Sequence, residues 1–471
     1  MCETRNIHIP AYVGGIDLSR PHLVAIGGAG MSALAHLLVR RGAHVSGSDI
    51  RTTDVTRALA AVGCHVHLGH DAAHVDDPSV VVWSSGVEQD TPELVAARAA
   101  GVPVVHRSHV LAQLLSEAHR SVVVGGTHGK SSTTAMLATA LRSLSPSWAG
   151  GGALIGGVNA AHGSGGVFVA EGDESDRSIA AYRPDVAVVL NVDDDHPETY
   201  VDRDDVLGVF ETFARGSRHL VASADDEGTR ALVERVRSSC VDVTTVGESE
   251  GADFRVVAIE QQAARSRVVV REPDGATTSF TVRVPGGEMA LNAAAAFVAG
   301  RVLGVDASEL ADGLGRFQGI QRRMSMVGEA SGVIVRDSFA HHARAIEADL
   351  AAGRALTSER LIVAFQPCGW TRTMAQGPDL GRALAVADEV VLLDVHSTVT
   401  PPFSGMTTEG LEKAVVEHGG RLHRVHGHEQ AADVVASLTG PGDLVLTMGT
   451  GDVTALGTVI LARTRAGVVT A

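Results

Sequence analysis

The stretch Ser121–Thr134 reads SVVVGGTHGKSSTT and decides the fold class of this chain. A short run of valines is typical of a buried strand, and the glycine-rich turn after it leads into a helical pattern that continues from Ala135. Glycines let backbone N–H groups close around phosphate oxygens, and the start of a helix adds its positive end. The order of strand, glycine turn and helix therefore predicts a site for a nucleoside triphosphate.

Lys130 and Ser131 follow the glycines of this turn. In phosphate-binding loops the lysine supplies a mobile positive charge for the terminal phosphates, and the hydroxyl is placed to ligate Mg²⁺. The first glycine of the strict motif is replaced by Val124, which leaves the shorter form Gly-Thr-x-Gly-Lys-Ser. We predict that the loop contacts a nucleoside triphosphate through Gly126, Thr127, His128, Gly129, Lys130, Ser131 and Ser132.

The composition of the 471 residues limits the class of protein. Hydrophobic residues make up 45% of the chain, enough for the cores of about three domains. A net charge of −16 argues against a nucleic-acid partner and against an anionic membrane surface, since both need a basic footprint. No apolar run approaches the ~20 residues of a membrane span.

Cysteine spacing and the first residues bear on location. The cysteines lie far apart with no Cys-x-x-Cys pair, which argues against a disulfide framework or a zinc site. The segment Met1–Arg5 begins no basic stretch followed by an apolar core, as a signal peptide would. We therefore expect a cytoplasmic protein. The four cysteines are Cys2, Cys64, Cys240 and Cys368.

The first 118 residues alternate strand and helix patterns. A strand over 22–26 leads into Gly28-x-Gly30-x-x-Ala33, and a second strand ends in Asp49, about twenty residues after the glycines. This is the fingerprint of a dinucleotide-binding turn, in which a pyrophosphate approaches the backbone and the acid accepts from a ribose hydroxyl. A βαβ unit without a ligand has the same pattern. Two later strands, 79–83 and 102–105, run into Ser84, Ser85 and Arg107.

Two acidic runs follow strands of the second predicted sheet. The strand 167–170 is followed by Glu171–Asp176 (EGDESD), and the strand 186–191 by a run that ends at His196. Because the carboxyl ends of parallel strands share one edge of a sheet, both runs should lie beside the phosphate loop. Carboxylate oxygens together with the nucleotide's phosphates are what Mg²⁺ requires. Away from a phosphate loop, such runs are usually solvated loops.

The remaining chain predicts a small annex and a third sheet. Short alternating strands over 253–284 indicate an antiparallel annex, and a helix over 289–302 carries Asn292 as its notable polar residue. From about 325 onward the chain is again βαβ, with polar residues after its strands. We expect an α/β protein with a Rossmann-like N-terminal sheet, a central P-loop ATPase-like domain with the annex, and a Rossmann-like C-terminal domain. The predicted domains are 1–118, 119–324 and 325–471.

These motifs, taken together and in order, resemble the Mur ligase family over essentially the whole chain. The Gly-Gly-Ala-Gly-Met-Ser and Asp-Glu-Ser-Asp segments resemble its alanine-adding branch. The matching positions are Ile26–Ser32, Gly126–Ser131, Glu171–Asp176, Asp195–His196, Asn292, Arg322–Arg323, Asp337, His341–His342, Phe365–Pro367, Arg372–Thr373 and Gly442–Gly449.

The resemblance implies a peptidoglycan-precursor ligase with a UDP-sugar domain, an ATP domain and an amino-acid domain. It implies that ATP and Mg²⁺ activate the carboxylate of UDP-N-acetylmuramate as an acyl phosphate, which the amine of L-alanine then attacks. Lys130, Glu174, His196 and Arg323 match catalytic positions, and Ser131, Glu174 and His196 match metal positions. Nucleotide contacts would also come from Asn292, Arg323 and Asp337. Amino-acid contacts would come from His341, His342 and Arg372.

The same resemblance assigns the first domain to the sugar nucleotide rather than to NAD. A nicotinamide oxidoreductase joined to a nucleotidase, and a binding protein without catalysis, are the alternatives from other classes. We expect a monomer or a homodimer. The UDP-sugar contacts are expected from Gly28, Ala29, Gly30, Met31, Asp49, His70, Ser84, Ser85, Arg107, Ser175 and Asp176.

Several segments depart from the family's usual pattern. Gly287-Glu288 stands where a basic residue and a histidine are usual, and Ala343–Ala345 where Pro-Thr-Glu is usual. Cys368 replaces a histidine, and the stretch 396–400 lacks the usual Arg and Glu. A carboxylate at position 288 adds negative charge near a triphosphate. Most departures concern the third domain, so a divergent paralogue that uses another amino acid or a peptide as acceptor is the alternative.

Overall fold

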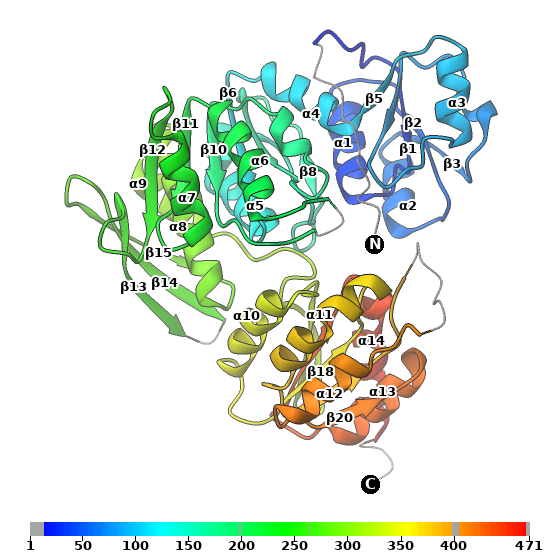
Figure 1. The fold of residues 1–471 in the computed structure, drawn as a ribbon, viewed down its shortest axis with the longest axis vertical. Coiled ribbons are helices and arrows are strands. Elements are labelled where there is room, and N and C mark those ends of the chain that lie inside the picture. The colour runs from blue at the N-terminus through cyan, green and yellow to red at the C-terminus, as the bar shows by residue number, and fades with distance from the viewer. Residues whose placement is uncertain (1–13, 197–198, 263, 398–404, 468–471) are drawn as a thin grey trace. The chain divides into compact units, whose positions relative to one another are not determined.

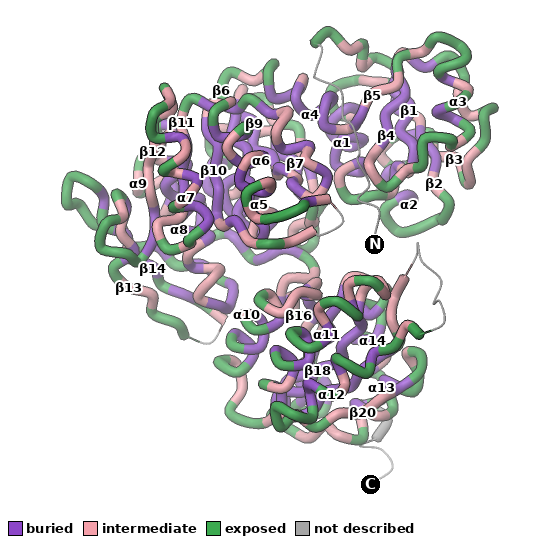
Figure 2. The backbone as a smooth tube through the Cα atoms, in the orientation of Figure 1, coloured by how far each residue is buried: buried purple, intermediate pink, exposed green. Residues whose placement is uncertain are grey.

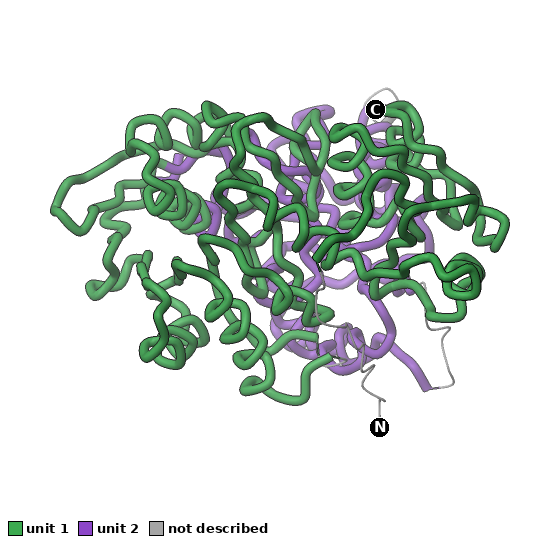
Figure 3. The backbone as a smooth tube through the Cα atoms, turned by 90° about the horizontal axis from the view of Figure 1, so that it is seen from above, with its two compact units in different colours: residues 1–259, 267–282, 290–317 green, residues 260–266, 283–289, 318–471 purple. Residues whose placement is uncertain are grey.

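The computed structural model describes residues 14–196, 199–262, 264–397 and 405–467. The first five residues and positions 398–400, which entered the sequence analysis, lie outside these ranges. The chain forms two compact units, one of residues 1–259, 267–282 and 290–317 and the other of residues 260–266, 283–289 and 318–471 (Figure 3). The described residues form sheets of five, ten and six strands. The first lies in unit 1, the second lies in unit 1 apart from residues 260–262 and 265–266, and the third lies in unit 2.

The five-stranded sheet is parallel throughout and has the strand order β3-β2-β1-β4-β5 (Figure 1). The order reverses beside β1, and α1 begins directly after the glycine turn that follows this strand, so the turn lies at the switch point where such sheets bind ligands. This confirms the Rossmann-like expectation. The elements are β1 (Pro21–Val24), α1 (Ala29–Arg40), β2 (Ser46–Asp49), α2 (Asp54–Ala61), β3 (His65–Leu68), η1 (Ala72–His74), β4 (Val80–Trp83), α3 (Pro92–Ala99), β5 (Val104–His106) and α4 (Arg107–Ser116).

Histidines line one face of this sheet, where aliphatic side chains are usual. His22 on β1, Ser46 on β2 and His65 on β3 are successive cross-strand neighbours, and the His22 Nδ1 lies 3.0 Å from Ser46 Oγ. The His67 ring stacks on that of His74 with centroids 4.2 Å apart. Burial lowers the pKa of His22 to about 4, although the nearby carboxylate of α3 opposes the shift. His22 is therefore neutral at physiological pH.

The His22 environment predicts a specific loss of stability in acid. An unfolded histidine has a pKa near 6.5, so below that pH protons bind the unfolded chain first and the free energy of unfolding falls. We expect His22 to account for about 2–3 kcal/mol of the loss between pH 7 and pH 4.5. Urea denaturation of the wild type and of His22→Asn at both pH values measures this contribution.

The exposed His44 provides the control for that comparison. His44→Asn should lose stability with pH as the wild type does, whereas His22→Asn should lose less. An equal pH slope for His22→Asn and the wild type would contradict the proposed environment of His22.

The ten-stranded sheet has the order β15-β14-β13-β12-β11-β10-β6-β9-β7-β8, and the phosphate-loop strand β6 lies between β10 and β9 in parallel register. The strands of the expected annex extend this same sheet beyond β12 rather than forming a separate one. The strands are β6 (Arg120–Gly125), β7 (Ser147–Ala149), β8 (Ala160–Ala161), β9 (Val167–Glu171), β10 (Val186–Val189), β11 (His219–Ser223), β12 (Asp242–Gly247), β13 (Phe254–Gln262), β14 (Arg265–Arg271) and β15 (Thr277–Val282).

Helices cover this sheet, and its central strands are buried (Figure 2). The valines of β6, Val122, Val123 and Val124, are fully buried, as their run predicts. The helices are η2 (Arg142–Leu144), η3 (Ser178–Ala181), α5 (Lys130–Ala140), α6 (Arg203–Arg215), α7 (Glu227–Val236), α8 (Gly287–Val302) and α9 (Ala307–Leu314).

The six-stranded sheet has the order β16-β17-β21-β18-β19-β20, and β16 is antiparallel to β17 while the other pairs are parallel. Separate apolar clusters lie on its two faces, one with α10, α11 and α12 and the other with α13 and α14, so the sheet is doubly wound. Its elements are β16 (Ser325–Ala330), β17 (Val333–Ser338), α10 (Ala343–Arg354), β18 (Leu361–Phe365), α11 (Trp370–Leu384), β19 (Glu389–Leu392), α12 (Glu409–Glu417), β20 (Leu422–Arg424), α13 (Gly427–Leu438), β21 (Leu444–Met448), η4 (Asp452–Ala455) and α14 (Leu456–Gly467).

Across the described ranges, none of the helices combines the length and the apolar character needed to cross a membrane. Each of the three sheets lies within one of the three predicted domain ranges. The boundaries at 118 and 324 stay predictions.

Candidate functional site

The phosphate loop connects β6 to α5 through a backbone that only glycine adopts easily. Gly126 has φ +134° and Gly129, which precedes the first residue of α5, has φ +83°. A Cβ on Gly129 would lie 2.6 Å from Oδ1 of Asn292 on α8. The amide that the resemblance associates with the nucleotide therefore packs directly on the loop.

Asn191, at the end of β10, holds the loop in this shape. Its Oδ1 accepts a hydrogen bond from the His128 N–H at 2.7 Å, and its backbone carbonyl accepts from the Thr127 N–H at 3.1 Å. Sequence reasoning assigned Asn191 no role. Its position directly after a strand that neighbours the phosphate-loop strand is the signal that could have identified it.

Lys130 is partly buried, with 15% of its side chain exposed, and its ammonium is surrounded by acceptors. Its Nζ donates to Glu174 Oε1 at 2.8 Å and to the carbonyls of Gly126 and Thr127 at 2.7 and 3.1 Å. Burial opposes the charge, yet the carboxylates of Glu174 and Glu171 raise the pKa of Lys130 above its usual value. The ammonium therefore stays charged at the turn where phosphate would bind.

His196 lies close to the Glu174 carboxylate. Its Nε2 is 3.8 Å from Glu174 Oε1 and 3.4 Å from Asp195 Oδ2. The structure thus brings together Lys130, Glu174 and His196, three of the four positions that match catalytic residues of the family. The fourth, Arg323, belongs to unit 2.

The donors for a metal ion are carboxylate and hydroxyl oxygens. Glu174 Oε2 is buried and has no hydrogen-bond partner among the described residues, so it is an oxygen that a cation would satisfy. Ser131 donates its hydroxyl to Glu171 Oε1 at 2.9 Å. In the described part of the chain no three His, Cys, Asp or Glu side chains form a preformed cage. The set fits Mg²⁺, which typically takes one or two carboxylates and completes its shell with phosphates and water.

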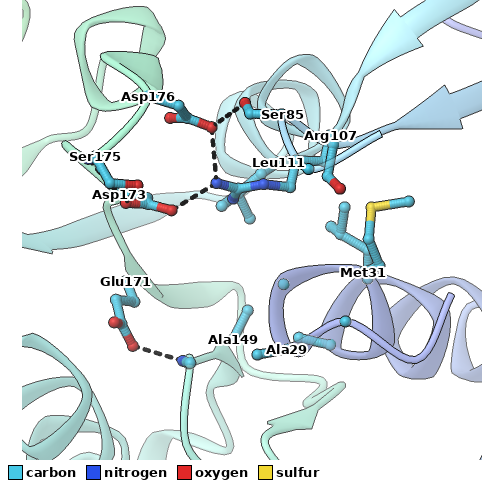
Figure 4. Close-up of a pocket in the computed structure, with 18 residues that line it drawn as sticks. Ala29, Met31, Ser85, Arg107, Leu111, Ala149, Glu171, Asp173, Ser175 and Asp176 are labelled. Carbon is cyan, nitrogen blue, oxygen red and sulfur yellow. Dashed lines mark hydrogen bonds and ion pairs between the residues drawn. The ribbon is translucent and has the colours of Figure 1, made fainter. Parts of the chain in front are cut away.

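A cavity of about 370 Å³ is lined in part by the acidic segment Glu171–Asp176 (Figure 4). Its walls come from the start of α1, the ends of β4 and β5, the segment after β7 and the segment after β9. Nine of the eleven positions expected to contact the UDP-sugar line it, namely Gly28, Ala29, Gly30, Met31, Ser84, Ser85, Arg107, Ser175 and Asp176.

Asp49 and His70, the other two expected positions, do not line this cavity. Asp49 Oδ2 accepts the Gly27 N–H at 2.9 Å, so the carboxylate fastens the glycine turn. The His70 Nδ1 lies 3.1 Å from Ser48 Oγ and 3.0 Å from the buried Glu93 Oε1. A contact of either residue with the sugar nucleotide stays a prediction.

Arg107 is the cation of the cavity wall. Its Nη2 donates to Asp173 Oδ2 at 2.7 Å and to Asp176 Oδ2 at 3.1 Å, and Ser85 Oγ donates to the same Asp176 oxygen at 2.5 Å (Figure 4). Burial opposes the ionised form of Asp173, but Arg107 and Lys130 hold its pKa down at about 2. The carboxylate is therefore fully charged.

In unit 2, Asp337 is a buried anchor of the third sheet. Its carboxylate accepts from the hydroxyls of Thr447 and Thr454 at 2.7 and 2.8 Å, and Nε of Arg322 lies 3.3 Å away. The guanidinium of Arg323 stands 5.6 Å from the ring centroid of Phe339. The nucleotide contacts expected of Asp337 and Arg323 stay predictions.

The three positions expected to bind the amino acid lie together. Arg372 Nη1 donates to His342 Nε2 at 3.3 Å, and the His341 and His342 rings have centroids 4.1 Å apart. Burial, reinforced by the positive neighbours, puts the pKa of His341 well below its usual value, so this ring is neutral. Burial also raises the pKa of Glu288 to about 7, and Asp349 acts in the same direction. The residue that replaces the usual histidine is therefore a weaker negative charge than an exposed glutamate.

A phosphate loop, a glycine fingerprint at a sheet switch point and a third doubly wound sheet define a multidomain nucleotide-dependent enzyme. Family profiles match the chain in the same order. The Mur ligase family, catalytic domain, matches residues 20–119, the Mur ligase middle domain matches 124–300, and the Mur ligase, glutamate ligase domain, matches 322–451.

Curated relatives and solved structures agree with the profiles. The UDP-N-acetylmuramate–L-alanine ligase of Streptomyces avermitilis is 47% identical over 454 residues, covering 95% of this chain and 97% of that protein. That of Paenarthrobacter aurescens is 42% identical, covering 95% and 98%. The crystal structure of UDP-N-acetylmuramate-alanine ligase from Thermotoga maritima matches with a TM-score of 0.82 and 26% identity, covering 95% and 99%. A murein peptide ligase from Psychrobacter arcticus, at 21% identity and a TM-score of 0.70, shares the fold.

The chain belongs to the Mur ligase family.

The close packing of Asn292 on the phosphate loop makes Gly129 intolerant of a side chain. Any Cβ there is strained by the left-handed backbone and also collides with the amide. We expect Gly129→Ala to weaken ATP binding by at least about tenfold, a loss of roughly 1.4 kcal/mol, measured by calorimetry.

Gly304 provides a matched control, because its φ is +81° and a Cβ there would have nothing within 4 Å. Gly304→Ala carries the same kind of backbone strain without the collision, so its ATP affinity should equal that of the wild type. Equal affinities for Gly129→Ala and Gly304→Ala would contradict the proposed packing.

Proposed function

We propose that this chain is an ATP-dependent carboxylate–amine ligase that joins L-alanine to UDP-N-acetylmuramate and releases ADP and phosphate. The single observation that carries the proposal is the segment Asp173–Asp176, which follows β9 and reaches both the phosphate loop and the cavity of the first sheet. Relatives with up to 47% identity over nearly the full length carry the name of this activity. The adjacency of an ATP loop and a sugar-nucleotide cavity is what such a reaction requires.

The chemistry explains why the two sites adjoin. A carboxylate is a poor electrophile, and transfer of the γ-phosphoryl group of ATP to one of its oxygens gives an acyl phosphate with a good leaving group. Both reactants are anions, so their approach must be made favourable by fixed positive charge. Lys130, at the loop and held in its charged form by neighbouring carboxylates, supplies that charge.

The cavity orients the sugar nucleotide. The N-terminus of α1, whose first residues line the cavity, would offer its helix end to the pyrophosphate, and Arg107 adds a guanidinium. Ser84 and Ser85 offer hydroxyls at the end of β4. The carboxylate of the sugar would then lie toward the segment that carries Glu174 and Asp173.

Mg²⁺, when bound, would neutralise the charge on the transferred phosphoryl group. Glu174 would hold it through its unpartnered oxygen, with Ser131 and His196 completing the protein donors. Ser131 would then turn its hydroxyl oxygen from Glu171 toward the ion.

Arg372 and His342 would receive the acceptor's carboxylate. A guanidinium matches a carboxylate in shape and charge. Because the His341 ring is neutral, it would not repel the amino group of the acceptor. The names of the relatives support L-alanine over another amino acid or a peptide. We also propose a cytoplasmic location, in keeping with the free thiols of Cys64, Cys240 and Cys368.

Phosphate release tests this proposal directly. The wild type with ATP, Mg²⁺ and UDP-N-acetylmuramate should release phosphate with L-alanine and much more slowly with glycine, serine or a murein tripeptide. Equal or faster release with another acceptor would contradict the assignment of L-alanine. The absence of release with every acceptor would contradict the ligase assignment itself.

Lysine substitution tests the role of Lys130, because the chain contains only one other lysine, the exposed Lys413. Lys130→Met should lower kcat by roughly a hundredfold or more through loss of charge at the transferred phosphate. Lys413→Met changes the same residue type at the surface and should leave kcat unchanged. Comparable kcat values for the two variants would contradict the role given to Lys130.

A further inference from the structure

Three carboxylates on four consecutive residues divide between two cations. Asp173 and Asp176 contact Arg107 at the sugar cavity, and Glu174 contacts Lys130 at the phosphate loop. The proposed function uses Glu174 and Lys130 but gives Asp173 no task. The position of Asp173 on the guanidinium that faces the sugar nucleotide requires an explanation.

Arg107 stands where a pyrophosphate would approach the fingerprint turn. Its side chain lies against Gly30, with Nη1 only 3.3 Å from the point a Cβ on that glycine would occupy. In Figure 4 the guanidinium extends from α4 across the cavity toward the segment after β9. One positive charge therefore faces two carboxylates, and the local net charge at this wall is negative.

The two carboxylates are held very differently. Asp176 is 5% exposed, and its oxygens also accept from Ser85 Oγ and the Ser178 N–H, so it is fixed in place. Asp173 is 37% exposed. Among the described residues, its Oδ2 accepts a hydrogen bond from Arg107 alone, while its Oδ1 accepts from Ser175. The contact between Asp173 and Arg107 is therefore the one that a ligand can displace.

We propose that Asp173 competes with the anionic group of the sugar nucleotide for the guanidinium of Arg107. The inference rests on the proposed function and adds a specificity-determining residue to it. A ligand that carries only part of the sugar nucleotide gains too little binding free energy to displace the Asp173 carboxylate from Arg107. A complete nucleoside diphosphate sugar, with its further contacts in the cavity, gains enough. The Asp173 carboxylate thus repels anionic ligands, which increases selectivity for the complete sugar nucleotide and lowers the affinity for it.

Binding of UDP-N-acetylmuramate, measured by calorimetry at fixed ionic strength, tests the competition in a double-mutant cycle. Asp173→Asn keeps an oxygen that can accept from Ser175 but removes the charge, so it should tighten binding by roughly fivefold. In the Arg107→Gln background the same substitution should have an effect at least about threefold smaller, since the contested guanidinium is gone.

Asp77 provides the control, because it is 81% exposed and pairs with Arg20 at the surface. Asp77→Asn should leave the affinity unchanged. Thermal unfolding of each variant establishes that Asp173→Asn and Arg107→Gln remain folded, and the conservative Arg107→Lys, which retains one donor group and the charge, provides a second background.

Three outcomes would overturn the proposal. Unchanged or weakened binding by Asp173→Asn would show that the carboxylate does not compete. Equal tightening with and without Arg107 would show a general charge effect instead. If the wild type and all variants fail to bind UDP-N-acetylmuramate, the proposed function fails and this inference with it, whereas the first two results contradict this inference alone.

Discussion

The ion pair between Lys130 and the buried Glu174 is the interaction on which the site depends. An ammonium withdrawn from water is stable only with a compensating anion and further acceptors, which Glu174 and the carbonyls of the phosphate loop supply. The pair fastens the segment after β9 to the loop after β6. It can form because β6 and β9 are parallel neighbours, so that their carboxyl ends lie at one edge of the sheet. Strand order in the second sheet is therefore a requirement of the chemistry.

The segment after β9 also explains how one enzyme can serve two anionic substrates. Its Glu174 reaches the phosphate loop, while Asp173 and Asp176 reach Arg107 at the start of α4. In the proposed function, reactants that would repel one another in water would meet at this short segment, which has a cation on either side. Lys130 and Arg107, both partly buried, are charged for the same reason, because carboxylates offset their loss of hydration. The charged groups of the site are therefore already positioned by the fold, without any substrate.

Local patterns predicted more of the fold than of the side-chain contacts. The phosphate loop, the fingerprint turn and the main parallel strands follow from valine runs and glycine spacing, whereas β8 and β20, of two and three residues, are too short to show a period. Contacts between distant residues were not visible. The bond from His128 to Asn191 spans 63 positions and that from Ser131 to Glu171 spans 40, so only the folded sheet brings them together. The hydrogen bond from the Gly27 N–H to Asp49, 22 positions away, is a further contact of this kind.

Isotope transfer tests the central claim, that the phosphate loop and the sugar cavity together phosphorylate a carboxylate. UDP-N-acetylmuramate labelled with ¹⁸O in its carboxylate is turned over with ATP, Mg²⁺ and L-alanine, and the released phosphate is analysed by mass spectrometry. An acyl phosphate leaves one carboxylate oxygen on phosphate when the amine attacks, so the account predicts phosphate that carries one ¹⁸O. Unlabelled phosphate, formed alongside the amide product, would contradict it.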